Sequence, residues 1–463
     1  MSQTELAFLS IAELAPRIAA HELSPVALTD AVLARIARHN DQLNAYITVT
    51  EESARQAAQA AETTIQAGNY LGPLHGVPVA VKDLFAMRGV RTTCGSPLLA
   101  DWIPNHDAAV VEQLMKAGAV IVGKTNLHEL AYGTTSNNPH YGAVHNPWDP
   151  KYHPGGSSGG SATAVAAGLA MGALGSDTGA SIRQPAACCG IVGLKPTFGC
   201  VSKFGALPLS WSMDHVGPMT RTVHDCALML QALAGHDSRD PTSIDRSVPD
   251  YVAHLDRNLL RRRIGIARDY FFENCDPEVA ALVDAAVGVL RDLGAVTEEI
   301  VLPDMRAARA AGSLIISVEA AAYHAVDLRE RPGSFSDELR AALEMGSFYS
   351  GVDYAQAQRM RRLISAETER RLAGFDAIVM PTSPVAATPI VDDPPGHVTL
   401  RSRNTLPFDF VSLPAISVPC GFTAAGLPIG LQIVGKAFDE AGVLQIAYAY
   451  ERATSWHSRH PLL

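Results

Sequence analysis

The feature that most constrains the fold is a series of short apolar segments that alternate with stretches of helical periodicity. The apolar segments predict buried strands at 76–82, 119–122, 264–267, 296–302, 377–380, 414–419 and 430–434. The periodicity predicts a helix that begins after Ser24 and further helices at 51–67, 108–117, 161–174, 278–293 and 356–372. Helices that alternate with short buried strands are typical of layers around a mixed or parallel sheet. We therefore predict an α/β fold in which helices flank a large mixed sheet.

The domain organisation is predicted to be simple. A length of 463 residues would suggest about three domains, but large α/β enzymes often form one continuous core. The chain contains no internal repeat. Its stretches rich in Pro, Asp and Ser, at 236–250 and 388–400, are interpreted as surface loops rather than linkers.

Composition narrows the class of protein. Apolar residues make up 47% and charged residues 18%, which supplies a large core and excludes a disordered chain. The net charge of −10 shows no long like-charge run, so nucleic acid is not an expected partner. No stretch of about 18 apolar residues lacks polar interruptions and no signal-peptide pattern opens the chain, so we expect no membrane contact. The seven cysteines form no Cys-x-x-Cys pair, which favours a reducing compartment and a cytoplasmic protein.

Other familiar patterns occur in the wrong context. Residues 118–125 match the phosphate-loop pattern of nucleotide-binding proteins, but their central residues are the predicted strand itself and leave no loop for a phosphate. Residues 155–159 match the nucleophile elbow of esterases, but a polar, proline-containing stretch precedes them where that elbow needs a strand. The spacing of several histidines matches no standard zinc site, so no metal is expected: His128, His140, His145 and His153.

Two serines in glycine-rich segments and one lysine carry the chemistry. Ser157 stands in Gly-Gly-Ser-Ser-Gly-Gly, Ser181 in Asp-Thr-Gly-Ala-Ser-Ile-Arg, and Lys82 ends the apolar run Val-Pro-Val-Ala-Val. A serine hydroxyl needs an adjacent base to attack a carbonyl. Burial can lower the pKa of a lysine from ~10.4 to about 7–8, where its amine can act as that base. Because glycines also let backbone N–H groups approach an oxyanion, the combination predicts acyl transfer through a serine nucleophile.

Taken together, these segments resemble the amidase signature family. The resemblance rests on residues 155–186, on the lysine segment at 76–83, and on further stretches at 190–197, 214–218, 380–384 and 413–422. It covers essentially the full chain, and paired serine motifs with a lysine are far more specific than the phosphate-loop match. It implies the amidase signature fold as one domain over 1–463, with an N-terminal helical segment at 1–70 and the signature core at about 74–225.

The resemblance also implies a role for each site residue. Ser181 is the nucleophile, Ser157 is the bridging serine on a cis peptide bond, and Lys82 is the base. The oxyanion hole is formed by the backbone N–H groups of Thr178, Gly179, Ala180 and Ser181. Ala180 departs from the commonest pattern, which has glycine there; the N–H is kept, while the methyl group can narrow the acyl pocket. Neither a metal nor an organic cofactor is implied.

Two functions within this family are weighed. The first is a free-standing amidase that hydrolyses a small-molecule carboxamide to a carboxylate and ammonia or an amine through an acyl-enzyme. The alternative is the glutamine-hydrolysing A subunit of the tRNA-dependent amidotransferase, which uses the same machinery to release ammonia from glutamine. Two differences from the amidotransferase A subunit favour the amidase. The sequence of residues 129–136 differs from the one usual in that subunit, and residues 402–404 lack the acidic residue that the subunit has near this point.

The substrate and the assembly are less constrained. Tyr132 and Trp211 are candidates to line the substrate pocket, and the alternative for each is packing in the core. Carbamates and esters fit the same acyl chemistry. Relatives are usually dimers, so the resemblance is compatible with a homodimer.

Overall fold

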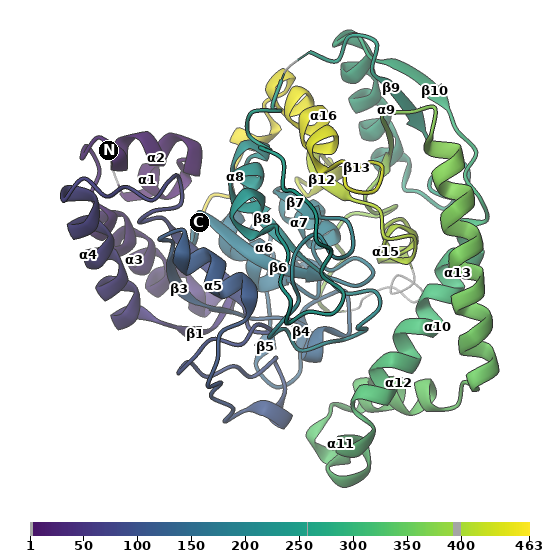
Figure 1. The fold of residues 1–463 in the computed structure, drawn as a ribbon, viewed down its shortest axis with the longest axis horizontal. Coiled ribbons are helices and arrows are strands. Elements are labelled where there is room, and N and C mark those ends of the chain that lie inside the picture. The colour runs from purple at the N-terminus through teal and green to yellow at the C-terminus, as the bar shows by residue number, and fades with distance from the viewer. Residues whose placement is uncertain (1–2, 257, 392–399) are drawn as a thin grey trace.

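One mixed sheet of 11 strands forms the centre of the molecule (Figure 1). The computed structural model describes residues 3–256, 258–391 and 400–463, so most of the loop predicted at 388–400 lies outside the described residues. In the order in which they pair, the strands are β1 (Tyr46–Val49), β3 (Val120–Thr125), β2 (Pro78–Lys82), β6 (Gly172–Asp177), β8 (His215–Thr220), β7 (Val192–Lys195), β12 (Ala415–Phe422), β13 (Pro428–Val434), β11 (Ala377–Pro381), β9 (Arg263–Ile266) and β10 (Val296–Glu299).

Strand direction within the sheet is mixed. β2 pairs parallel with both β3 and β6, and β9 pairs parallel with β10 and β11. The central pairs from β6 through β8, β7, β12 and β13 to β11 are antiparallel. A separate two-stranded hairpin joins β4 (Asn137–Asn138) and β5 (Gly142–Ala143). The predicted α/β fold with a large mixed sheet is thereby confirmed.

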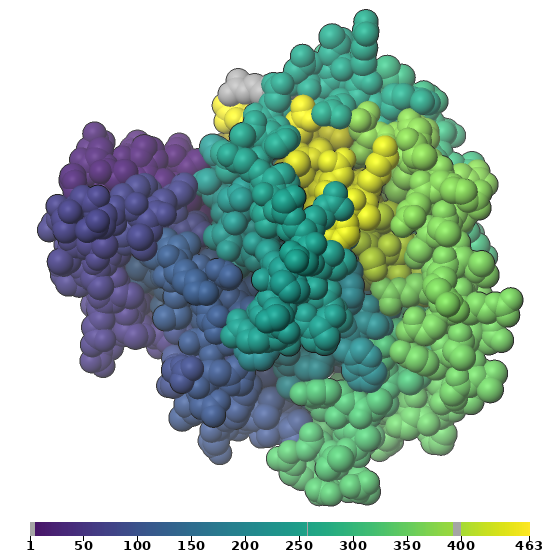
Figure 2. Space-filling model, viewed as in Figure 1, coloured from purple at the N-terminus to yellow at the C-terminus, as the bar shows by residue number. Residues whose placement is uncertain are grey.

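Helices surround this sheet. They are α1 (Gln3–Phe8), α2 (Ile11–Ala19), α3 (Pro25–Leu43), α4 (Glu51–Gln66), α5 (Ala109–Lys116), α6 (Gly159–Ala166), α7 (Arg183–Cys189), α8 (Val223–Leu233), α9 (Pro277–Asp292), α10 (Met305–Tyr323), α11 (Ala325–Glu330), α12 (Asp337–Ser347), α13 (Gly351–Leu372), α15 (Leu406–Phe410) and α16 (Glu440–Ala453). The helices α1 to α4 gather at the left of the molecule, and α10 to α13 form a band along its right side (Figures 1 and 2). Within the described residues no helix is both long and apolar enough to cross a membrane.

Local sequence accounts for where two of the helices, α3 and α10, begin. Ser24 caps α3, because its side chain accepts a hydrogen bond from the Ala27 N–H, and Pro25 occupies the first turn. Asp304 caps α10 in the same way through the Ala307 N–H. These caps satisfy N–H groups that the first helical turn leaves unpaired.

The helix predicted at 161–174 is wrong in its second half. The helix α6 ends at Ala166, Gly168 adopts a left-handed φ of 68°, and the strand β6 begins at Gly172. Small residues with low strand propensity form β6, but the strand lies between β2 and β8 and all six of its residues are buried. The pairing and burial of β6 between two strands therefore outweigh the low strand propensity of its residues.

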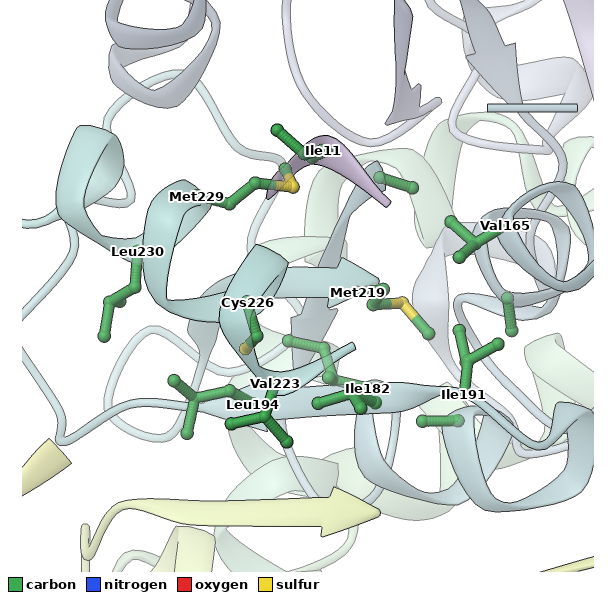
Figure 3. Close-up of a cluster of buried hydrophobic side chains, with 14 of the residues drawn as sticks. Ile11, Val165, Ile182, Ile191, Leu194, Met219, Val223, Cys226, Met229 and Leu230 are labelled. Atoms are coloured by element: carbon green, nitrogen blue, oxygen red, sulfur yellow. The ribbon is translucent and has the colours of Figure 1, made fainter. Parts of the chain in front are cut away.

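A buried apolar cluster anchors the segment that carries Ser181. Ile182, the next residue, is fully buried and lies among Leu194, Met219 and Val223 (Figure 3). Gly193 leaves room for it, since a Cβ there would come within 3.0 Å of Ile182 Cγ2. The candidate nucleophile is thus adjacent to a side chain that the core holds in place.

Candidate active site

Strand order brings the lysine and serine segments to one edge of the sheet. Lys82 is the last residue of β2, and Asp177 is the last residue of the parallel strand β6. Because neighbouring parallel strands end at the same edge, the turn that follows Asp177 lies beside Lys82. Ser181 occupies this turn, just before α7.

Lys82 is fully buried among hydroxyl groups. Its Nζ lies 2.7 Å from Ser157 Oγ, 3.0 Å from Ser158 Oγ and 2.9 Å from Ser176 Oγ. Burial lowers the pKa of Lys82 to about 7, although the carboxylates of Asp177 and Asp214 oppose the change. A substantial fraction of this amine is therefore uncharged near neutral pH, as a base requires.

The hydroxyl groups around Lys82 have separable roles. Ser158 Oγ donates its proton to the Ser176 carbonyl at 3.2 Å, so toward Lys82 it can only accept. An uncharged amine keeps two N–H bonds, which Ser158 and Ser176 can accept, and its lone pair is then left to face Ser157. Ser157 is the neighbour whose proton Lys82 can take.

Sequence reasoning missed the contacts of Ser158 and Ser176 with Lys82. Ser158 directly precedes α6, but its hydroxyl makes no capping bond and instead contacts Lys82. Ser176 lies on β6, which was not predicted as a strand. If β6 had been predicted, its parallel pairing with β2 would have indicated that residues near Ser176 lie close to Lys82, because Val81 pairs with Leu174.

The segment that carries Ser157 is held on both sides. The peptide bond between Gly156 and Ser157 is cis. The Gly156 N–H donates to Gln184 Oε1 at 2.9 Å, and the Ser157 carbonyl accepts from the His128 N–H and from Ser136 Oγ, each at 3.2 Å. Backbone and side-chain contacts therefore fix the position of the Ser157 hydroxyl.

The two serine segments are in direct contact. The Ser158 N–H donates to the Ser181 carbonyl at 3.2 Å. Ser181 is 6% exposed whereas Ser157 and Lys82 are fully buried, so Ser181 is the member of the three that a substrate can reach. This order of exposure agrees with a nucleophile at the surface of the site and a base behind it.

The turn at 178–181 presents its carbonyls to the protein. The Gly179 carbonyl accepts from Thr405 Oγ1 at 2.6 Å, the Ala180 carbonyl from the Gln184 N–H at 2.9 Å, and the Ser181 carbonyl from Ser158. All four residues of the turn also line the cavity that opens onto Ser181. An oxyanion hole formed by their N–H groups stays a prediction.

A buried ion-pair network braces this turn. Asp177 Oδ2 accepts from the backbone N–H groups of Ile182 and Arg183 and from the Arg183 side chain at 2.9 Å. Arg183 also contacts Asp409 at 2.5 Å and the Thr405 carbonyl at 2.9 Å, which ties the turn to α15. Burial is the largest influence on the pKa of Asp177, but the Arg183 charge and hydrogen bonds outweigh it and hold that pKa low.

A cavity of about 330 Å³ opens onto Ser181 and the turn before it. Its walls come from the turn itself, from the loop after His128, from α10 and α12, and from the segment at Ser402 and Leu406. The α10 and α12 walls were not identified in the sequence, because no motif marks them. Tyr132 lines this cavity, and its hydroxyl lies 3.1 Å from Ser317 Oγ.

Trp211, the other candidate for the substrate pocket, does not line this cavity. It is 44% exposed and lines a neighbouring cavity of about 210 Å³, which Thr178 and Ser176 also border. The structure thus places Ser181 and Tyr132 on the wall of one cavity and Trp211 on the wall of the other, whereas Lys82 and Ser157 are fully buried and contact each other.

The competing patterns have structural roles. Lys124 of the phosphate-loop match is buried on β3, pairs with Asp83 at 3.0 Å, and donates to the Phe85 carbonyl. His140 contacts Glu129, and His153 contacts Thr388. In the part of the chain that the structure describes, no group of three or more His, Cys, Asp or Glu side chains could hold a metal ion.

Comparison with known protein families finds a match over most of the chain. Residues 27–444 match the Amidase family. The chain therefore belongs to the Amidase family, and the resemblance to amidase signature proteins is confirmed.

Individual relatives include both amidotransferase subunits and amidases. The chain is 44% identical over 465 residues to the A subunit of the glutamyl-tRNA(Gln) amidotransferase of Roseiflexus sp. (strain RS-1), covering 95% of each chain. A solved structure described as a vestigial protein complex that reveals the origins of an s-triazine catabolic enzyme is similar at 34% identity, with a TM-score of 0.92 over 96% of this chain and 98% of that one. The peptide amidase from Stenotrophomonas maltophilia is similar at 34% identity, with a TM-score of 0.86 over 98% of each chain.

Proposed function

We propose that this chain hydrolyses the C–N bond of a carboxamide through an acyl-enzyme on Ser181. The contact that carries the proposal is the 2.7 Å hydrogen bond between the fully buried Lys82 amine and Ser157, in a segment that touches Ser181. A weak hydroxyl nucleophile needs such a base, and an uncharged lysine supplies it.

The first half of the reaction forms the acyl-enzyme. Ser181 Oγ attacks the amide carbonyl as its proton passes to Ser157, whose own proton passes to Lys82. The oxyanion accepts hydrogen bonds from the N–H groups of the turn at 178–181. When the C–N bond breaks, the proton returns from Lys82 through Ser157 to the leaving nitrogen, and ammonia or an amine departs.

The second half repeats this sequence with water. Water attacks the ester carbonyl and gives its proton through Ser157 to Lys82. The proton then returns to Ser181 Oγ as the C–O bond breaks. The product leaves as the carboxylic acid and gives its remaining proton to solvent, which yields the carboxylate. No step requires a group outside the chain other than the amide and water.

Two candidates for the substrate remain, and the relatives favour the one that the sequence analysis placed second. Relatives at 41% to 44% identity carry the name of the A subunit of glutamyl-tRNA(Gln) amidotransferase, which supports glutamine hydrolysis in company with partner proteins. This finding supports the amidotransferase component better than the free-standing amidase.

One observation favours the free-standing amidase. Ser402 lines the cavity beside Leu406, at the point where the amidotransferase component is expected to present an acidic side chain to the amino group of glutamine. The cavity wall also includes apolar side chains from α10 and α12, which suit an acyl group with apolar character: Ile316 and Leu339. For the free-standing amidase we also propose a homodimer and a cytoplasmic location.

Ammonia release from purified protein separates the candidates. Hydrolysis of simple aliphatic or aromatic amides without a partner supports the free-standing amidase, whereas hydrolysis of glutamine only in the presence of partner proteins supports the amidotransferase component. Release must disappear in Ser181→Ala. Absence of release from every amide, with and without partners, would contradict amide hydrolysis itself.

A further inference from the structure

The pairing of β6 with β8 places two side chains beside the start of the turn at 178–181. The two strands are antiparallel, and His215 lies opposite Asp177, the last residue of β6. His215 Nδ1 lies 3.2 Å from the Asp177 carbonyl oxygen. Asp214 precedes His215, and its Oδ1 accepts a hydrogen bond from Thr178 Oγ1 at 2.6 Å. Residues at the start of β8 therefore hold the point at which the turn begins.

The Asp214 carboxylate also binds a second segment of the cavity wall. Its oxygens accept from the Leu209 N–H at 3.0 Å and from the Ser210 N–H at 3.0 and 3.1 Å. Leu209 and Thr178 line both the cavity that opens onto Ser181 and the neighbouring one, whereas Asp214 lines the neighbouring one. The carboxylate thus joins two parts of the wall that the cavities share, and it contacts the site through them.

Asp214 is a buried anion that hydrogen bonds stabilise. Burial raises its pKa to about 6, although the Thr178 hydroxyl, the backbone N–H groups and the charge of Lys203 oppose the change. It is therefore ionised for the most part at neutral pH. A hydrogen bond to an ionised acceptor is roughly twice as strong as one between neutral groups, so the contact with Thr178 restrains the turn firmly.

The turn offers one side chain by which it can be held in this way. Gly179 and Ala180 carry no side chain that forms hydrogen bonds, and Ser181 Oγ is the proposed nucleophile. Glycine also leaves the backbone around it conformationally free. The Thr178 hydroxyl is therefore the side-chain anchor of the backbone that carries the predicted oxyanion donors.

We propose that Asp214 is a positioning residue, which holds the turn at 178–181 through the Thr178 hydroxyl so that the N–H groups of the turn meet the developing oxyanion. The inference rests on the proposed amide hydrolysis and adds to it a residue that acts through another. Oxyanion donors stabilise the transition state more than the bound amide, so a turn without its anchor should lose kcat rather than affinity for the substrate.

Steady-state kinetics on the best amide substrate tests the anchor. Thr178→Val replaces the hydroxyl by a methyl group and leaves the Asp214 carboxylate in place. It should lower kcat by about 10- to 100-fold and change KM by less than about threefold, because a displaced turn aligns poorly with the oxyanion. Thr178→Ser keeps the hydroxyl and should restore most of the activity. A wild-type kcat in Thr178→Val, even at lower stability, would overturn the inference.

Thr242→Val is the matched control. Thr242 Oγ1 donates to Asp240 Oδ1 at 2.7 Å, and both residues line the same neighbouring cavity as Asp214. This hydrogen bond joins two residues of one loop and does not reach the turn. The control loses a Thr–Asp contact of similar length and should keep the wild-type kcat and KM. If it loses as much kcat as Thr178→Val, the inference is wrong.

A double substitution tests whether Asp214 acts through Thr178. Asp214→Asn keeps the shape of the side chain but turns an NH2 group toward one of its former donors, so kcat should fall. If the two residues act as a unit, Asp214→Asn should cost much less kcat in the Thr178→Val protein than in the wild type. Losses that multiply would contradict the inference. If Asp214→Asn does not fold, Thr178→Val and its control decide the question.

A tetrahedral inhibitor measures the turn apart from turnover. A trifluoromethyl ketone with the acyl group of the best amide forms a hemiketal when Ser181 Oγ bonds to its carbonyl carbon. The ketone oxygen becomes the oxyanion, and the serine proton passes through Ser157 to Lys82. Thr178→Val should weaken this inhibitor by about tenfold or more, whereas Thr242→Val should not. Equal inhibition of all three proteins would overturn the inference.

The pH dependence of kcat/KM separates an effect on the turn from an effect on the base. Burial lowers the pKa of Lys82 to about 7, against the Asp177 and Asp214 carboxylates, and Thr178→Val changes none of these charges. The midpoint should therefore stay in place, and a shifted midpoint would show that the hydroxyl acts on the base. Absence of turnover on every amide would contradict the proposed function, and the inhibitor affinities would then decide the inference alone.

Discussion

At the scale of single residues, the chemistry depends on the charge of one buried amine. Lys82 sits behind two serines, at the end of an apolar strand, and its three hydroxyl neighbours can solvate an uncharged amine as well as an ammonium. Asp177 and Asp214 attract the proton, but burial outweighs them. The base is therefore kept in its reactive form without a separate activating group.

The pH dependence of activity follows from this balance. The pKa of Lys82 is lowered to about 7, and only the uncharged amine accepts a proton, so kcat/KM on a neutral amide should rise with pH below about 7 and level off above it. A pH–rate profile measures the midpoint. A limb centred near the ordinary lysine pKa of ~10.4 would show that burial does not tune this amine.

Removal of the base and of the bridging serine should have graded effects. Lys82→Met should lower kcat by about 100- to 10,000-fold, the range typical of a lost acid–base group, and should abolish the limb near pH 7. Ser157→Ala should also be severe but leave more residual activity, because the base remains. Circular dichroism first confirms that both proteins are folded. Steady-state kinetics then shows which of the two substitutions lowers kcat more. Unchanged kcat in Lys82→Met would contradict its role.

The catalytic side chains were the most predictable part of the site. The apolar run before Lys82 indicates its burial, and the glycines around Ser157 and Ser181 indicate tight turns. Their proximity came only from the family resemblance, because nothing in the spacing of three distant segments places them together. The walls of the cavity on α10 and α12 could not be found in this way, since both helices lie more than a hundred residues from Ser181 and no motif marks them.

At the scale of elements, close packing around α6 positions the serine segment. Gly160 lies where a Cβ would come within 2.3 Å of the Asn126 carbonyl oxygen and 2.5 Å of the Ala45 carbonyl oxygen. Both neighbours are backbone atoms, which cannot rotate away. The helix that follows Ser157 and Ser158 can therefore approach β3 and its flanking loops only because it begins with glycines.

A pair of alanine substitutions tests this packing. Gly160→Ala should lower the free energy of unfolding by about 1–3 kcal/mol or more, because overpacking forces the backbone apart. Gly288→Ala, in the middle of α9 with no atom within 4 Å of the added Cβ, should raise it by about 0.5–1 kcal/mol through helix propensity. Urea denaturation gives both values. Similar shifts in the two proteins would argue against a tight contact at Gly160.

The strands and helices that were predicted well are those whose residues favour, by composition or periodicity, the secondary structure that they adopt in the fold. The strands β2, β3, β9 and β11 are rich in Val and Ile, and the helices α4, α5 and α9 have clear periodicity. β6 was missed because Gly, Ala, Ser and Asp do not favour strands, and it forms through pairing with β2 and β8. Such a long-range effect cannot be seen in a local pattern.

At the scale of the whole molecule, both halves of the chain build one sheet. β7, from the first half, pairs with β12 from near the C-terminus, and Lys195 lies opposite Ala415. Arg183 joins the two halves again through Asp409 and Gln432. The site turn is thus held by residues that are more than two hundred positions apart.

Unfolding should reflect this shared sheet and test the predicted single domain over 1–463. Differential scanning calorimetry should show one transition, with a van't Hoff enthalpy close to the calorimetric enthalpy. Ser181→Ala serves as a control that leaves the sheet intact and should unfold in the same way. Two resolved transitions, with one retained in a fragment that ends before β9, would contradict a single cooperative unit.

The most direct test of the catalytic assignment identifies the serine that becomes acylated. A fluorophosphonate transfers its phosphonyl group to an activated serine with loss of fluoride, and peptide mass spectrometry locates the adduct. We expect a single adduct on Ser181 in the wild-type protein, much slower labelling in Lys82→Met, and none in Ser181→Ala. An adduct on Ser157 or Ser158, or full labelling of Ser181→Ala, would contradict it.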